Sequence, residues 1–246
     1  MADDDERVLD AVRAAGLLPA ATPVLVMLSG GRDSVCLLDV ALRLVDPNAV
    51  TALHVNYNLR VGAGEDERHC RALCSRRGVD LTVVGPPPSG PPRRGNLQAW
   101  ARDLRYGAAS RLALRLGALV ATGHTASDLA ETVLYRLAAS PGRRALLGMP
   151  RRDGRLVRPL LEVTREETTA YCRARGLAWR EDESNGSRHF ARARVREGLV
   201  PALRSLHPAA ERNVARTAHE LRDEGEVLDD LVTTLLAGRE ALPGTE

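Results

Sequence analysis

The sequence predicts an α/β protein built on a doubly wound parallel sheet, with a helical extension at its C-terminal end. Short apolar runs rich in β-branched residues alternate along the chain with longer segments whose apolar residues recur at helical spacing. A glycine pair, Gly30 and Gly31, stands between the first apolar run and the first of these segments. Because ligands of doubly wound sheets gather beyond the carboxyl ends of the strands, this junction is the first place to expect a site.

Four strand-and-helix pairs are predicted in the first part of the chain. Residues 24–28 are a continuous apolar run, which suits a buried strand, and Val35, Leu38 and Leu42 then recur at helical spacing. The following pairs are strand 50–55 with helix 66–77, strand 81–84 with helix 96–116, and strand 118–122 with helix 127–138. Residues 85–95 hold glycines and prolines too closely spaced for a regular element and predict an exposed loop.

The later part of the chain predicts one more strand and two more helices. Strand 156–157 leads to helix 164–175, which Thr164 and Glu167 begin with a capping-box pattern. A long, polar-rich helix follows from residue 208. We expect residues 1–206 to form the main domain, and residues 207–246 to form a helical connector or the start of a second domain.

Composition places the chain among cytoplasmic proteins with no membrane segment. It has 246 residues, 44% of them hydrophobic, and no run approaches the roughly 20 apolar residues of a membrane span. The first residues, Met-Ala-Asp-Asp-Asp-Glu, are too acidic for a signal or transit peptide. In such a compartment the four cysteines predict no disulfide framework.

Charge is unevenly distributed along the chain. The net charge is +3, and because the sequence contains no lysine, all 35 basic residues are arginine. Residues 136–204 hold 16 arginines against 8 acidic residues. A basic half of this kind is typical of a nucleic-acid-binding surface; the alternative is a solvated surface in an arginine-biased proteome.

The stretch from Ser29 to Ser34 predicts a phosphate site. It is a strand-to-helix turn, and a helix N-terminus offers free N–H groups and a positive dipole end to an anion. A Walker loop is excluded because it needs a lysine, and the dinucleotide pattern Gly-x-Gly-x-x-Gly is absent from the junction. What remains is Ser-Gly-Gly-x-Asp-Ser, whose hydroxyls and amides suit a pyrophosphate and whose Asp33 can reach Mg²⁺. The alternative is an ordinary turn in which Asp33 caps the helix.

This stretch resembles the PP-loop of the N-type ATP pyrophosphatases, a family with an adenine nucleotide α hydrolase-like fold. Four further stretches resemble blocks of the tRNA(Ile)-lysidine synthase family within that group. They are HVNYNLR at residues 54–60, NLQAWARDLRY at 96–106, GHTASDLAETVLYRL at 123–137, and EDESNGSRHFARARVREGLVPAL at 181–203. The resemblance spans residues 24–206, and it implies that residues 1–206 are the catalytic domain.

The resemblance implies an activity, its cofactors and its partners. Members attach L-lysine to the wobble cytidine of tRNA(Ile) with a CAU anticodon, using ATP and Mg²⁺ and releasing AMP and diphosphate. The implied ATP-binding residues are Ser29, Gly30, Gly31, Arg32, Asp33, Ser34 and His54. The implied catalytic residues are Asp33, which also binds the metal through ATP, His124 and Arg105. A homodimer is compatible with these expectations.

Charged side chains suggest where lysine and tRNA bind. Asp128 and Glu131 are three positions apart on one helical face, and acids can pair with the cationic amine of lysine. Their alternative role is to stabilise a helix N-terminus. Arg192 and Arg196, four positions apart, are candidates for the tRNA backbone, and Arg105 for the adenylate or the phosphate of the cytidine. Packing or a surface salt bridge is the alternative for each arginine.

Two other functions compete with this interpretation. A tRNA thiolase of the same fold needs reactive cysteines, commonly as Cys-x-x-Cys, and no pair has that spacing. Cys36, in the first helix turn after the loop, is interpreted as core packing. A non-catalytic RNA-binding module is the second rival, and the intact Ser-Gly-Gly-x-Asp-Ser motif argues against it.

Overall fold

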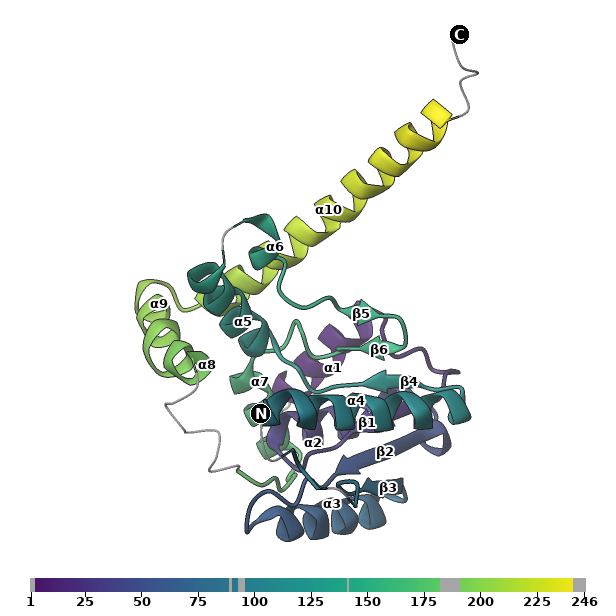
Figure 1. The fold of residues 1–246 in the computed structure, drawn as a ribbon. Helices are drawn as coiled ribbons and strands as arrows, with labels where there is room; N and C mark the ends of the chain where they lie inside the picture. The colour runs from purple at the N-terminus through teal and green to yellow at the C-terminus, as the bar shows by residue number, and fades with distance from the viewer. Residues whose placement is uncertain (1–2, 89, 93–95, 141, 182–190, 241–246) are drawn as a thin grey trace. The chain divides into compact units, whose positions relative to one another are not determined.

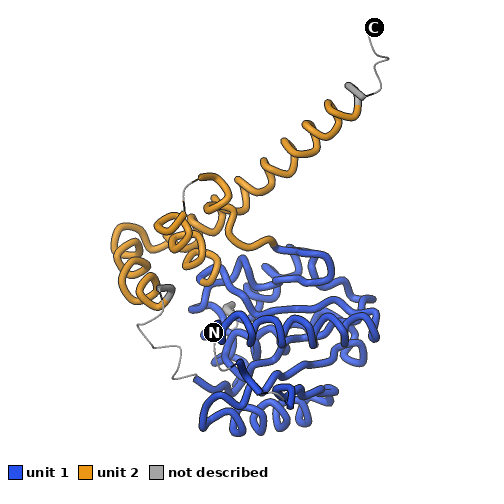
Figure 2. Tube along the Cα trace, in the orientation of Figure 1, with its two compact units in different colours: residues 1–127, 151–187 blue, residues 128–150, 188–246 orange. Residues whose placement is uncertain are grey.

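A computed structural model describes residues 3–88, 90–92, 96–140, 142–181 and 191–240 of the chain. The chain divides into two compact units (Figure 2): residues 1–127 with 151–187, and residues 128–150 with 188–246. The domain boundary expected between residues 206 and 207 stays a prediction. None of the described helices is both long and apolar enough to cross a lipid bilayer.

The first unit is built on a mostly parallel sheet, which confirms the predicted fold class. Its strands, among the described residues, are β1 (Val24–Met27), β2 (Val50–Val55), β3 (Asp80–Val84), β4 (Leu119–Ala121), β5 (Arg152–Asp153) and β6 (Leu156–Val157). Their order is β3-β2-β1-β4-β6-β5, and only the β5–β6 pairing is antiparallel.

Alternating side chains of the strands supply two cores, one on each face of the sheet. Val24 and Val26 of β1 pack on one face with α1 (Asp3–Ala15), α2 (Arg32–Leu44), α3 (Ala63–Arg77) and α7 (Arg165–Ala174). Leu25 and Met27 pack on the other face with α4 (Leu97–Leu116), the helix drawn across the sheet in Figure 1. Both faces of β1 are therefore buried, as its continuous apolar sequence predicts.

The order of the strands creates a switch point beside β1. The chain proceeds from β1 through β2 to β3 on one side and then returns to place β4 on the other side of β1. Ligands of open α/β sheets bind in the crevice at such a point, outside the carboxyl ends of the strands. The segments that follow β1 and β4, beginning at Leu28 and at Thr122, lie at this switch point.

Most predicted elements are present within one to three residues of their expected bounds. The capping box of α7 is confirmed, since Thr164 accepts from the Glu167 N–H and Glu167 accepts from the Thr164 N–H. Residues 85–88 and 90–92 carry no helix or strand, as expected of the loop, whereas Arg93 and Arg94 lie outside the described residues. Helix α1 and strand β5 were not foreseen.

The second unit is helical. It contains α5 (Ala126–Ala139) from Asp128 onward, and then α6 (Arg143–Leu146), α8 (Ala191–Arg194), η3 (Val195–Leu199, a π-helix), α9 (Val200–Leu206) and α10 (Ala210–Glu240). The long helix expected from residue 208 is α10.

A glycine turn anchors α10 within this unit. Gly148 has a φ of +55°, and a Cβ at this position would lie 2.3 Å from Cδ1 of Leu129 on α5. Its carbonyl oxygen accepts from Nη1 of Arg136 at 2.9 Å, and the Leu147 carbonyl accepts from Nη2 of Arg222 on α10 at 2.8 Å. Only glycine suits the backbone conformation and the space at this turn.

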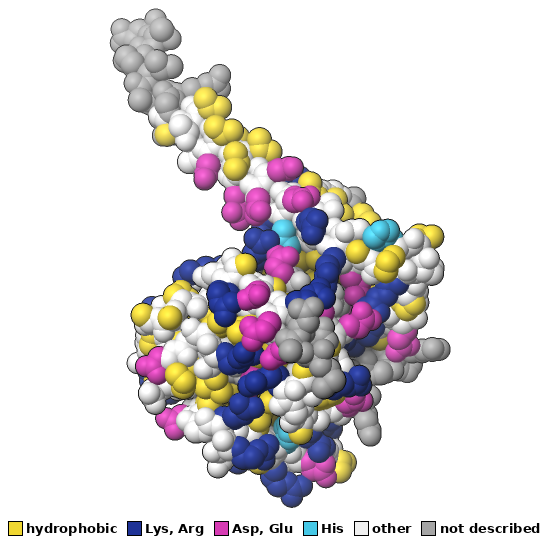
Figure 3. Space-filling model, turned by 180° about the vertical axis from the view of Figure 1, so that it is seen from behind, with side chains coloured by type: hydrophobic (Ala, Val, Ile, Leu, Met, Phe, Trp, Pro, Cys, Tyr) yellow, Lys and Arg dark blue, Asp and Glu magenta, His cyan; other side chains and the backbone are white. Residues whose placement is uncertain are grey.

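Beyond this anchor, one side of α10 exposes an apolar surface (Figure 3). It consists of six side chains that are each more than half exposed: Val227, Leu228, Leu231, Val232, Leu235 and Leu236. A contiguous apolar surface of this kind usually marks a binding interface.

Candidate active site

The predicted phosphate loop begins directly after β1 and ends in the first turn of α2. Gly30 adopts a φ of +86°, and a Cβ there would lie 3.2 Å from Sγ of Cys70, so the position requires glycine. The Ser29 and Ser34 hydroxyls are 3.1 Å apart, and Ser34 donates to the Gly31 carbonyl at 2.8 Å. Helix α2 begins at Arg32 and has no side-chain cap, so its first N–H groups are left to an incoming anion.

Asp33 lies in the first turn of α2, and its carboxylate is held by two side chains. Arg32 donates to both oxygens, with Nε 3.0 Å from Oδ1 and Nη2 3.2 Å from Oδ2. The Thr168 hydroxyl donates to Oδ1 at 2.5 Å. The alternative role of Asp33 as helix cap is not observed, because the N-cap residue is Gly31 and has no side-chain bond.

The chemistry around Asp33 fits a magnesium ion held jointly with a nucleotide. No group of three or more His, Cys, Asp or Glu side chains in the described part of the chain could hold a metal by itself. Mg²⁺ is commonly bound by one or two carboxylates together with phosphate oxygens. Asp33 is the carboxylate placed beside the glycine-rich loop, and its side chain is 23% exposed.

The turn after β4 approaches this loop closely. A Cβ on Gly123 would lie 3.0 Å from the carbonyl carbon and oxygen of Asp33 and 3.1 Å from the Ser34 nitrogen. His124, the next residue, is half-buried, and its Nδ1 lies 2.9 Å from Oγ1 of Thr122. The predicted catalytic His124 is therefore one residue from a direct backbone contact with the phosphate loop.

His54 lies on the other side of β1, near the carboxyl end of β2. It is buried, with 4% of its surface exposed, and its Nδ1 is 2.9 Å from the Leu28 carbonyl oxygen. The Cys70 thiol on α3 lies 3.4 Å from the same nitrogen. In this arrangement His54 supports the last residue before the loop, and the expected ATP contact stays a prediction.

Arg105, on α4, belongs to a cluster of arginine and aromatic side chains. Its guanidinium lies 5.1 Å from the centroid of the Tyr106 ring, over which Arg102 also lies at 4.6 Å. The Nε atom of Arg105 is buried and has no hydrogen-bond partner among the residues that the structure describes. Burial raises the pKa of nearby Tyr57, and the positive charge of Arg105 acts in the opposite direction. A buried guanidinium nitrogen without a partner suits an anionic ligand.

The predicted lysine-binding and tRNA-binding residues meet each other in the second unit. Glu131 on α5 is 3% exposed, and both of its oxygens accept from Arg196, at 2.8 Å from Nε and 3.0 Å from Nη2. Arg196 reaches Glu131 from the π-helical segment η3, a type of segment that is frequent at functional sites. Asp128, one turn earlier on α5, is half-buried.

Several other arginines between residues 136 and 204 form contacts within the protein. Arg151 pairs with Glu162 at 2.7 Å and Arg204 with Glu211 at 2.6 Å. Arg143 donates to the Leu221 carbonyl at 2.8 Å. Arg192 lies in α8, but its side chain is outside the described part of the structure. The positive charge of residues 136–204 therefore serves internal contacts as well as any partner.

Two residues that the sequence analysis missed lie against the loop. Thr168 bonds to Asp33 from α7, and Arg180 donates its backbone N–H to the Gly30 carbonyl at 3.0 Å while its side chain pairs with Asp66 at 2.7 Å. The sequence pattern nearest to Thr168 is the capping box of Thr164 and Glu167, which fixes where α7 begins but does not indicate a contact with the loop. Neither contact follows a sequence motif, because each joins residues more than 100 positions apart.

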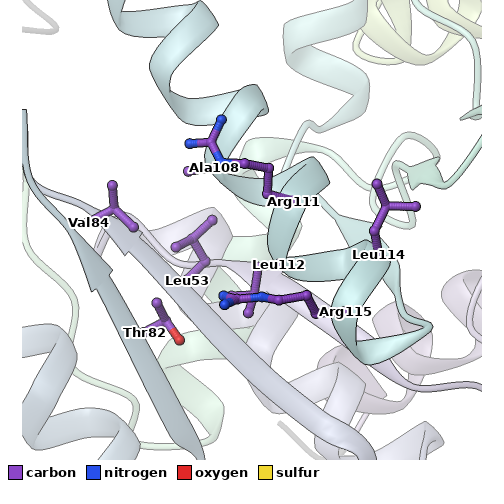
Figure 4. A pocket seen from close by; sticks show the side chains of 8 residues that line it. All are labelled: Leu53, Thr82, Val84, Ala108, Arg111, Leu112, Leu114 and Arg115. Atoms are coloured by element: carbon purple, nitrogen blue, oxygen red, sulfur yellow. The ribbon is translucent and has the colours of Figure 1, made fainter. Parts of the chain in front are cut away.

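A groove of about 410 Å³ lies elsewhere in the first unit (Figure 4). It is lined by mostly apolar side chains of β2, β3 and α4 and by two arginines of α4. They are Leu53, Thr82, Val84, Ala108, Arg111, Leu112, Leu114 and Arg115. None of the predicted site residues lines this groove, so we do not assign the active site to it.

The four cysteines are buried and unpaired. Burial raises the pKa of the Cys70 thiol to about 12 and that of Cys74 to about 11. A hydrogen bond with Cys172, together with burial, raises the pKa of Cys36 as well. Cys36 lies in the hydrophobic core, which confirms the packing interpretation. Buried thiols with raised pKa values are poor nucleophiles, so Cys36, Cys70 and Cys74 are unsuited to sulfur-transfer chemistry.

Comparison with known proteins agrees with the motifs. Residues 4–203 match the family model described as a PP-loop domain. The chain is 41% identical over 242 residues to the tRNA(Ile)-lysidine synthase of Salinispora arenicola, with 92% of this chain and 70% of that protein covered. The chain belongs to the tRNA(Ile)-lysidine synthase family. The resemblance stated from the sequence motifs is confirmed.

Relatives within the lysidine synthase family differ in length. The synthase of Pseudomonas fluorescens is 40% identical over 212 residues, which is 82% of this chain but 47% of that protein. Among solved structures, the U34-tRNA thiolase NcsA from Methanococcus maripaludis has a TM-score of 0.72 at 16% identity, covering 88% of this chain and 78% of that chain. At this identity the likeness shows a shared fold and not a shared substrate.

Proposed function

We propose that this chain attaches L-lysine to C2 of the wobble cytidine in the CAU anticodon of tRNA(Ile), at the expense of ATP. The observation that carries the proposal is the Ser29–Ser34 loop at the switch point of the sheet, in a chain of the lysidine synthase family. The product would change codon reading from AUG to AUA. A cytoplasmic location remains part of this proposal.

The proposed reaction has two steps. The C2 carbonyl oxygen of the cytosine attacks the α-phosphorus of ATP, and diphosphate leaves. The ε-amino nitrogen of lysine then attacks C2, AMP leaves with the former carbonyl oxygen, and the amine loses a proton. The loop residues suit the first step, because the α2 N-terminus and the Ser29 and Ser34 hydroxyls can stabilise negative charge on the leaving diphosphate.

Asp33 is proposed to bind Mg²⁺ together with the phosphates of ATP. The ion, when bound, would offset negative charge on the phosphate oxygens. Arg32 is proposed to contact the same phosphates, and Arg105 to steady the adenylate or the phosphate of the flipped cytidine through its unpartnered Nε. His124 is the proposed general base or hydrogen-bond partner at the end of β4.

Lysine is proposed to bind at Asp128 and Glu131. Acidic side chains can compensate the positive charge of the substrate, and the near-complete burial of Glu131 strengthens such a pairing. Because Arg196 already binds both oxygens of Glu131, a substrate amine would share that carboxylate with Arg196. The structure therefore supports a role for Arg196 in holding Glu131, beside its proposed contact with the tRNA backbone.

A homodimer is the remaining proposed partnership, and the apolar surface of α10 supports it. From Val227 to Leu236 pairs of apolar and polar residues alternate, and this pattern is the same when read backwards. An antiparallel pairing of two copies would therefore place apolar residues opposite one another and Asp229 and Asp230 opposite Thr234 and Thr233. A parallel pairing would instead bring like charges together.

An AMP-release assay tests the proposed function. With ATP, lysine and tRNA bearing a CAU anticodon, we expect AMP release that requires the tRNA. The Asp33→Ala variant should reduce this release by at least about 100-fold while circular dichroism shows an unchanged fold. If the variant releases AMP at the wild-type rate, the assignment of the phosphate loop is wrong.

A further inference from the structure

The carboxylate of Asp33 has a hydrogen-bond partner from a distant part of the chain. Thr168 is fully buried on α7, and its Oγ1 lies 2.5 Å from Oδ1 of Asp33. The same hydroxyl oxygen accepts from Nε of Arg32 at 3.1 Å. Arg32, Asp33 and Thr168 thus form a closed hydrogen-bonded group beside the phosphate loop.

The direction of the Thr168 bond follows from its partners. An ionised carboxylate has no proton to give, so the hydroxyl must donate to Asp33. A hydroxyl has one proton, so the Arg165 carbonyl at 2.9 Å from the same oxygen cannot receive it as well. Donation from Arg32 to the hydroxyl oxygen polarises the O–H group and strengthens its bond to Asp33.

The two oxygens of Asp33 are therefore unequally occupied. Oδ1 accepts from Thr168 and from Nε of Arg32, whose single hydrogen is shared between Oδ1 and Oγ1 of Thr168. Among the described residues, Oδ2 accepts from Arg32 alone, so one lone pair stays available. The guanidinium of Arg32 lies against Oδ2, and its positive charge would repel a divalent cation there. This repulsion would end when the Arg32 side chain moves toward the phosphate oxygens of ATP.

We propose that Thr168 is a positioning residue of the magnesium–nucleotide site. Its hydroxyl holds Oδ1 of Asp33, so that Oδ2 can bind the cation. The Thr168 bond keeps the carboxylate in this orientation when the Arg32 side chain leaves Asp33 and binds the phosphates of ATP. This inference rests on the proposed function, in which the loop binds ATP with magnesium.

The inference can be tested by calorimetry of nucleotide binding with and without Mg²⁺. The ligand is α,β-methylene-ATP, which cannot be cleaved between its α and β phosphates. Thr168→Val removes the hydroxyl and keeps the shape of the side chain. We expect it to weaken binding of the magnesium complex about 10-fold and to leave binding of the metal-free nucleotide within about 2-fold. Thr168→Ser, which keeps the hydroxyl, should restore the wild-type affinity.

Thr169→Val is the matched control. Thr169 is the neighbouring residue on α7, and its hydroxyl donates to the Arg165 carbonyl at 2.8 Å. This variant removes a helical hydroxyl without touching Asp33, and it should bind the magnesium complex like the wild type. If Thr168→Val does not fold, as thermal unfolding would reveal, Thr168→Ala carries the same expectation.

The possible results separate this inference from the proposed function. Wild-type affinity in Thr168→Val would overturn the inference alone. Equal weakening of the metal-free and magnesium complexes, or the same loss in Thr169→Val, would assign Thr168 a packing role and overturn it too. A wild-type protein that binds neither form of the nucleotide would overturn the proposed function and this inference with it.

Discussion

At the scale of single residues, the phosphate loop depends on two glycines, Gly30 and Gly123, whose neighbours leave little room for a side chain. Gly30 packs against Cys70 of α3, and Gly123 packs against the backbone of Asp33 and Ser34. The position of Asp33 is thereby tied to the ends of both β1 and β4. A small displacement of reacting groups can cost a large factor in rate, so these contacts matter for catalysis.

Gly123→Ala should impair nucleotide use more than it impairs folding. The new Cβ would lie 3.0 Å from the backbone of Asp33, and the loop would have to shift by a few tenths of an ångström. We expect kcat/KM for ATP to fall at least about 10-fold. Gly64→Ala is the control, because a Cβ at Gly64 meets nothing within 4 Å. Equal ATP kinetics in the two variants would show that the close approach has no functional role.

Glu131→Gln should raise the KM for lysine by about 10- to 100-fold and leave the KM for ATP nearly unchanged. The variant removes the charge that would pair with the substrate amine. Glu162→Gln, which alters an exposed partner of Arg151, controls for the loss of an ion pair. Steady-state kinetics with each substrate varied in turn give both constants. A parallel rise in both would assign Glu131 to the stability of α5.

At the scale of elements, the periodicity of apolar residues predicted the strands and most helices well. Strand β2 has the expected bounds, and β4 is shorter than expected by one residue at each end. Helix α1 was missed because its first residues are acidic, although Val8, Leu9 and Val12 of its later turns are buried. Strand β5 has two exposed residues, too few for a periodic pattern.

Contacts between elements were beyond the reach of such patterns. Sequence spacing grouped Asp128 with Glu131 and Arg192 with Arg196, because each pair was expected on one helical face. Asp128 and Glu131 do share α5, whereas Arg192 lies in α8 and Arg196 in the π-helical segment η3 that follows it. Sequence spacing could not show that Arg196 binds Glu131, because the two residues are 65 positions apart and a π-helical segment sets the direction of Arg196. Thr168 was missed for the same reason, at a separation of 135 positions from Asp33.

The proposed dimerisation through α10 can be tested by substituting residues of its apolar surface. If its apolar surface pairs two copies of the chain, Leu231→Glu should place a charge in the interface and weaken dimerisation at least about 10-fold. Thr217→Glu, which adds the same charge at an exposed position of α10 outside the segment from Val227 to Leu236, should leave the dimer intact. Light scattering over a range of concentrations measures both. Unchanged mass in Leu231→Glu, or a monomeric wild-type chain, would contradict the proposed pairing.

At the scale of the whole molecule, the sheet topology explains why widely separated motifs belong to one site. The return of the chain to β4 beside β1 brings the turn at Gly123 and His124 to the loop at Ser29–Ser34. The same fold in the thiolase NcsA shows that topology alone does not choose the chemistry. In this chain the thiols of Cys36, Cys70 and Cys74 are buried and their pKa values are raised, which does not suit sulfur-transfer chemistry.

Nucleoside analysis of the modified tRNA distinguishes lysine transfer from sulfur transfer by this chain. The protein would be incubated with ATP, magnesium, tRNA bearing a CAU anticodon, isotopically labelled L-lysine and, in parallel, a labelled sulfur donor. We expect lysine at the wobble cytidine, with one AMP released for each lysine joined, and no product with Asp33→Ala. Sulfur in the nucleoside, or ATP cleavage with no lysine joined, would contradict this expectation.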